Sequence, residues 1–130
     1  LASLLRDPYF KIRKLALQRI NRLSPEMSYQ TLQPLTLEDE FWERSINEKE
    51  DVYKIMARAA PEKMMPVMIE ILSGSSWFLS TRKIDEKVCA IAALSQIRIP
   101  ESQAIIERNL KSKSKPVKNA AQRALAKMKK

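Results

Sequence analysis

The chain has 130 residues, of which 45% are hydrophobic and 30% are charged, so its length suits one domain with a buried core. It contains no histidine and only one cysteine, which excludes histidine-based catalysis, disulfides within the chain and nearly all zinc sites. Its single glycine argues against β-hairpins, whose turns depend on glycine, while helix-forming residues are abundant. The composition therefore predicts an all-α fold, with Cys89 as a small core residue.

The formal charge of +9 is spread unevenly. Residues 1–24 hold six cations and one acid, residues 25–51 two cations and eight acids, and residues 98–130 ten cations and two acids. No apolar run approaches the roughly 20 residues of a membrane-spanning helix, so we expect a cytoplasmic protein with no membrane partner. Because the chain starts at Leu1, with neither a Met nor a secretory leader, we expect a module of a longer protein.

In chain order, four segments place apolar residues along one helix face: residues 8–23, 44–59, 82–97 and 111–128. They align on Ala16, Val52, Ala90 and Ala121. Three candidate short helices lie between them and start at the Pro-Glu pairs of residues 25–26, 61–62 and 100–101. Proline suits a first helical turn, and an acid beside it complements the helix dipole. We expect Pro34 and Pro66 to end or kink the first two of these helices.

The alternation of short outer and longer inner helices predicts two-helix units that bury their apolar faces only by stacking. It resembles the HEAT repeat family, whose inner helices carry an Asp-Pro, then Val-Arg, Ala and Ala-Leu at fixed spacings. Two segments match that pattern, through Asp7–Pro8, Ile12–Arg13, Ala16, Ile20 and Leu23, and through Pro116, Val117–Lys118, Ala121 and Ala124–Leu125. The resemblance implies one α-solenoid domain of about 3.5–4 repeats over residues 1–130. The second and third units depart from it, with Glu48 and Glu86 where the family has Val.

Two aromatic pairs precede the second and third inner helices, Phe41–Trp42 and Trp77–Phe78. Each is followed by an Arg-x-Ile-(Asn/Asp)-Glu-Lys stretch. We expect Asn47 and Asp85 to cap these helices, with Ile46 and Ile84 as hydrophobic staples, and Arg44 and Arg82 to pair with Glu48 and Glu86. The favoured interpretation is that each aromatic pair covers its own helix pair. The alternative is that both pairs line an exposed edge and face a partner.

A cation stands three positions before each aligned residue: Arg13, Lys49, Lys87 and Lys118. Stacked helical repeats present concave surfaces suited to protein partners, so this column predicts a non-enzymatic scaffold for an acidic partner. Trp42, Trp77 and Phe78 are further candidate partner-binding residues. The alternative interpretation of the column is a ladder in which each cation pairs with an acid of a neighbouring unit.

Nucleic-acid binding is the alternative function, because the C-terminal segment is densely basic. Its cations are Lys111, Lys113, Lys115, Lys118, Arg123, Lys127, Lys129 and Lys130. Against this, no aromatic residue follows Phe78, and no nucleic-acid motif is present. HEAT-like enzymes use His-Glu metal sites, or Trp, Asp and Arg in a basic groove, and this chain lacks the former and shows no matching spacing for the latter. We therefore expect no catalytic residue, metal, cofactor or small-molecule substrate.

Overall fold

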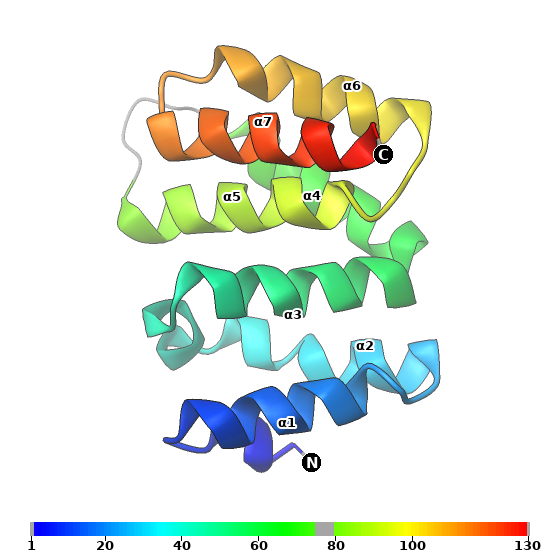
Figure 1. Ribbon diagram of the computed structural model, residues 1–130, viewed down its shortest axis with the longest axis vertical. Helices are drawn as coiled ribbons and strands as arrows, with labels where there is room; N and C mark the ends of the chain where they lie inside the picture. The colour runs from blue at the N-terminus through cyan, green and yellow to red at the C-terminus, as the bar shows by residue number, and fades with distance from the viewer. Residues whose placement is uncertain (1, 75–79, 130) are drawn as a thin grey trace.

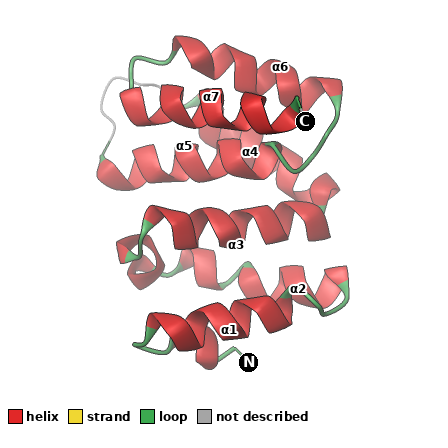
Figure 2. Cartoon of the chain, viewed as in Figure 1, coloured by secondary structure: helices red, strands yellow, loops and turns green. Residues whose placement is uncertain are grey.

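The computed structural model describes residues 2–74 and 80–129, and within them every regular element is a helix. The α-helices are α1 (Phe10–Ile20), α2 (Pro25–Leu32), α3 (Ile46–Ala59), α4 (Pro61–Ser73), α5 (Thr81–Leu94), α6 (Pro100–Arg108) and α7 (Lys115–Met128). Short 3₁₀ segments cover Leu4–Arg6, Leu35–Leu37, Asp39–Glu43 and Asn109–Lys111. The prediction of an all-α chain is confirmed for this part of the sequence (Figure 2).

The starts of the short helices follow from proline. Helices α2, α4 and α6 begin at Pro25, Pro61 and Pro100, as the sequence predicts. Helix α2 ends at Leu32, before Pro34. Helix α4 instead continues through Pro66 to Ser73, so of the two outcomes expected at Pro66, an end or a kink, the end does not occur. A proline inside a helix removes one backbone hydrogen bond, and the burial of apolar side chains on α4 offsets that loss.

The predicted caps of α3 and α5 are wrong, because serines further upstream fill that role. The Ser45 hydroxyl accepts a hydrogen bond from the Glu48 amide, and the Ser80 hydroxyl accepts one from the Lys83 amide. Helix α3 therefore begins at Ile46, which places Asn47 inside its first turn. Asp85 likewise lies inside α5. The predicted staples fail with the caps, since Ile46 and Ile84 lie within the helices and not before them.

The helices form two layers (Figure 1). Helices α1, α3, α5 and α7 lie one above another in the front layer and run in the same direction, while α2, α4 and α6 run the opposite way behind them. Within the front layer α3 packs on α5 and α5 on α7, and each rear helix packs on the front helix that follows it. The front layer is thus made of the four helices that the sequence aligns.

The core runs along the contact between the layers. The four aligned residues Ala16, Val52, Ala90 and Ala121 are all buried, as their positions predict. Helix α5 lies at the centre, and every residue from Lys87 to Leu94 is buried. Burial also raises the pKa of the Cys89 thiol, as expected for a core cysteine. None of the described helices is long and apolar enough to cross a membrane.

Candidate functional site

The four cations aligned in the sequence do not form one exposed row. Arg13 of α1 forms a two-bond ion pair with Glu48 of α3, with Nε–Oε2 and Nη2–Oε1 distances of 2.8 and 3.0 Å. The Arg44 guanidinium bonds the same carboxylate at 3.2 Å and also donates to the Leu5 carbonyl at 2.7 Å. The hydrogen bond to Glu48 raises the pKa of Arg13, whereas burial lowers the pKa of Arg44. This cluster joins α1 to α3.

Lys49 makes the corresponding connection from α3 to α5. Only 2% of the residue is exposed, and its ammonium donates to Asp85 Oδ2 at 2.6 Å and to the Trp42 carbonyl at 2.9 Å. Lys87 is also buried and donates to the Gly74 carbonyl at 3.0 Å. Because both ammonium groups are enclosed, neither residue can act as a partner contact on an open surface, which corrects that prediction. Arg13 and Lys49 instead fit the alternative ladder between units.

Lys118 is the exposed member of the column, and it has no ion pair within the part of the chain that the structure describes. The other cations of the C-terminal basic segment are exposed as well, namely Lys111, Lys113, Lys115, Arg123, Lys127 and Lys129. Lys130 lies outside the described residues. A strongly basic surface therefore covers α7 and the turn before it.

Trp42 is a core residue, as the favoured interpretation of the first aromatic pair has it. Its indole N–H donates to the Thr36 carbonyl at 2.9 Å, and its ring meets Phe41 edge to face with centroids 5.2 Å apart. The Lys49 ammonium and the Arg82 guanidinium each lie 5.5 Å from the Trp42 ring centroid. Trp42 is thus a buried residue whose indole N–H is bonded within the protein. The second pair, Trp77–Phe78, lies outside the described residues.

The two arginines beside the aromatic pairs make the predicted ion pairs. Arg44 pairs with Glu48 and Arg82 with Glu86, in both cases at 3.2 Å and four residues apart along the chain. Arg82 also pairs with Asp39 at 2.7 Å, which ties the start of α5 to the 3₁₀ segment before α3. These pairs brace the links between helices.

A groove on the front face brings together cations that the sequence prediction did not group as a site. Lys54 of α3 lies on one side, and Arg123 and Lys127 of α7 lie on the other. Its floor consists of small residues from α5 and α7: Val88, Ala92, Ser95, Ala120 and Ala124. Arg123 bonds Glu50 across the groove at 3.6 Å. The groove is shallow, with a volume of only about 20 Å³, so a partner would lie over it; it is flanked by cations and crossed by one weak ion pair.

Lys54 occupies an unfavourable position for a cation. Its pKa is lowered first by burial and then by the ammonium of Lys127, while Glu50 and Asp51 partly oppose the shift. The sequence alignment of the four front helices contains a signal for this site. Lys54 and Arg123 each stand two positions after an aligned residue, and Arg58 and Lys127 stand six positions after. Lys54 and Arg123 of the first column and Lys127 of the second line the groove, whereas the column three positions before the aligned residue is largely internal.

A cavity of about 300 Å³ lies between α1 and α3. Arg13 and Arg44 line it and both bond Glu48, while Lys14, Asn47 and Asp51 are further polar residues of its lining. Among the residues with a described structure, no three Cys, Asp or Glu side chains converge as a metal site. No protein-family model matches the chain, and neither a curated protein nor a solved structure matches it. Its surfaces are the guide to what it does.

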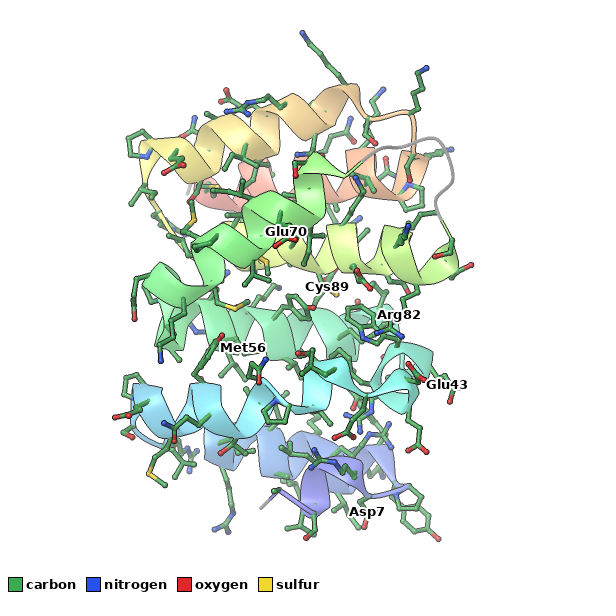
Figure 3. The ribbon with its side chains drawn as sticks, turned by 180° about the vertical axis from the view of Figure 1, so that it is seen from behind. Asp7, Glu43, Met56, Glu70, Arg82 and Cys89 are labelled. Atoms are coloured by element: carbon green, nitrogen blue, oxygen red, sulfur yellow. The ribbon has the colours of Figure 1, made fainter. Side chains whose placement is uncertain are left out.

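A second groove, with a volume of about 210 Å³, lies between α2 and α4. These two helices belong to the rear layer, which faces the viewer in Figure 3. The groove floor is formed by buried aromatic and methionine side chains: Trp42, Tyr53, Met56, Met64 and Met68. Leu37 and Val67 are exposed at its edges, and Arg82 and Glu86 lie at its border. Burial raises the pKa of the Tyr53 hydroxyl, so that group remains neutral in the groove floor. The groove is apolar and open to solvent.

Proposed function

We propose that the chain is an α-solenoid of HEAT-like repeats that binds an acidic segment of a partner protein and catalyses no reaction. Three features support the repeat architecture: the two layers of antiparallel helices, the buried aligned residues and the ion pairs between successive front helices. Solenoids of this kind present extended surfaces made by successive inner helices, and such surfaces suit elongated partners.

The observation that carries the binding proposal is the front groove. Lys54 faces Lys127 and Arg123 across a floor of small side chains, which lets a bound backbone approach closely. The mutual repulsion of Lys54 and Lys127 is relieved when a carboxylate lies between them, because each ammonium then gains an ionic hydrogen bond. Carboxylates of aspartate or glutamate side chains supply that group.

Two features of the structure favour a protein over a nucleic acid as the partner. Glu50 lines the groove and Asp51 lies beside it on α3, where both would repel a continuous phosphate backbone. The aromatic side chains Phe41 and Trp42 are buried, so they offer no stacking platform for bases. An acidic peptide with spaced carboxylates can pair with the cations and avoid these two acids.

The test uses fluorescence anisotropy of a short labelled peptide in which glutamate alternates with alanine. A double variant, Lys54→Glu with Lys127→Glu, is compared with Lys111→Glu and Lys113→Glu, which changes net charge equally at exposed sites outside the groove. We expect the groove variant to weaken binding about tenfold or more, because it places like charges opposite the peptide, and the control to weaken it far less. Equal losses in the two variants would mean that only the overall charge attracts the peptide.

The nucleic-acid alternative is measured with the same proteins and a labelled single-stranded oligonucleotide. It is favoured if the oligonucleotide binds more tightly than the acidic peptide and both variants weaken it equally. Binding through phosphates alone would also collapse between ~50 and 200 mM salt.

A further inference from the structure

Helix α1 exposes an apolar and basic face at one end of the stack. Large apolar side chains are exposed along it and beside it: Leu4, Tyr9, Phe10, Ile12 and Leu15. The helix contains no acid, and Lys11, Lys14 and Arg19 make no ion pair with any described residue. Lys11, Leu15 and Arg19 are four residues apart and so form one ridge, with Leu15 61% exposed at its centre.

The repeat explains why this face is unusual. The residue equivalent to Leu15 is the exposed Asp51 in the second front helix and the buried Cys89 and Ala120 in the third and fourth, so among the four front helices α1 alone carries a large exposed apolar side chain at this position. Helix α1 is the outermost α-helix of the front layer among the described residues, and the 3₁₀ segment Leu4–Arg6 packs against it (Figure 1). Contiguous exposed apolar side chains of this kind mark interaction surfaces.

The groove between α2 and α4 has the opposite charge. Three elements beside the groove, α2, α4 and the 3₁₀ segment Asp39–Glu43, carry exposed acids. These acids are Glu26, Asp39, Glu40, Glu43, Glu62 and Glu70. The single lysine of these elements, Lys63, lies 5.2 Å from the ring centroid of Tyr29. Arg82 at the groove border is bonded to Asp39 and Glu86. The groove floor is rich in methionine, whose flexible side chains adapt to different apolar partners.

We infer that the α1 ridge of one copy of this chain docks against the groove between α2 and α4 of a second copy. Leu15 and Ile12 enter the groove, and the flanking cations meet its acidic rim. Lys11 and Arg19 flank Leu15 on α1, and Glu26, Glu62 and Glu70 are exposed on the two helices that bound the groove. Both the apolar contact and the charges are then complementary.

The other arrangements of two copies are opposed by charge. Two α1 helices facing each other would bring their cations together, because neither helix carries an acid. The C-terminal end also carries an apolar depression lined by Ile99 and Met128, but residues 98–130 hold ten cations and two acids. Docking of α1 on the rear groove joins unlike surfaces, so a pair of copies retains one free ridge on one copy and one free groove on the other. Such a contact builds chains longer than dimers unless the rotation closes a ring.

Sedimentation velocity over a protein concentration series tests this association. We expect micromolar association that grows beyond the dimer and weakens at high salt, since an interface of this size is small and its charges are screened. Leu15→Glu removes the ridge and Val67→Lys places a cation in the groove edge, and both side chains are exposed. For each variant alone, the dissociation constant of self-association should be at least about tenfold higher than that of the wild type. Ile99→Glu, at another exposed apolar site, should associate like the wild type.

The decisive sample is an equimolar mixture of the Leu15→Glu and Val67→Lys proteins. It contains one intact ridge and one intact groove, so it should form a heterodimer that grows no further. A monomeric wild type, a monomeric mixture, or association that survives Val67→Lys would each overturn the inference. Circular dichroism establishes that the variants are folded. The acidic-peptide assay is a separate readout, because the front groove contains neither substituted residue.

Discussion

Removing the Lys49 ammonium tests whether the internal ladder holds successive units together. In Lys49→Met the side chain keeps its length, but the Asp85 carboxylate loses its cation and the Trp42 carbonyl loses its donor. Breaking a buried ion pair from one side costs about 3–5 kcal/mol. The Asp85 side chain is 23% exposed and keeps some contact with water, so we expect a loss near the lower end, about 3 kcal/mol. For a chain of this length that corresponds to a fall in Tm of about 10 °C.

Urea unfolding followed by circular dichroism gives the free energies of unfolding. Lys118→Met is the matched control, because Lys118 is exposed on α7, and it should change stability by no more than about 0.5 kcal/mol. A double-mutant cycle with Asp85→Asn should give a coupling energy of about 1–2 kcal/mol. If Lys49→Met were as stable as the control, the ladder would not contribute to the stacking, and the reasoning would be refuted.

Three further predictions follow from single contacts. Ser45→Ala should lower the free energy of unfolding by about 1 kcal/mol because it removes the α3 cap, whereas Asn47→Ala should be nearly neutral. If urea unfolding showed the larger loss for Asn47→Ala, then Asn47 and not Ser45 would be the cap. The buried Cys89 thiol has a raised pKa and should react with a thiol reagent only as fast as the protein unfolds, so rapid labelling of the native protein would contradict its burial. The hydrogen bond from Arg6 lowers the pKa of Glu38, so the Arg6–Glu38 pair adds stability above about pH 4.5, and this stability is lost on further acidification. Arg6→Met should therefore flatten the curve of stability against pH in the acidic range. An unchanged curve would contradict the role of this pair.

The helical periodicity of the sequence was enough to predict the fold class and most helix positions. Apolar spacing located the four front helices, since burial of Ala16, Val52, Ala90 and Ala121 depends on which face of each helix meets the core. Proline marked the starts of α2, α4 and α6 because it fits the first turn without losing a hydrogen bond. These are local properties, and local sequence determines them.

The candidate surfaces were harder to predict because they depend on contacts between distant residues. A lysine column looks the same in the sequence whether its members reach solvent or an acid in the next unit. Lys49 and Asp85 are 36 residues apart, and only the packing of α3 on α5 brings them together. Serine caps were missed for a related reason, since Ser45 and Asn47 are both good caps and the start of the helix decides between them.

The front groove is the most direct place to test the proposed function. The measurement is a titration of the isotope-labelled protein with the glutamate-alanine peptide, followed by backbone and lysine side-chain NMR signals. We predict that the largest shifts fall on Lys54, Ala92, Arg123 and Lys127, and that the peptide raises the lowered pKa of Lys54 toward its ordinary value. Shifts confined to Lys111, Lys113 and Lys115, with the pKa of Lys54 unchanged, would contradict the proposal.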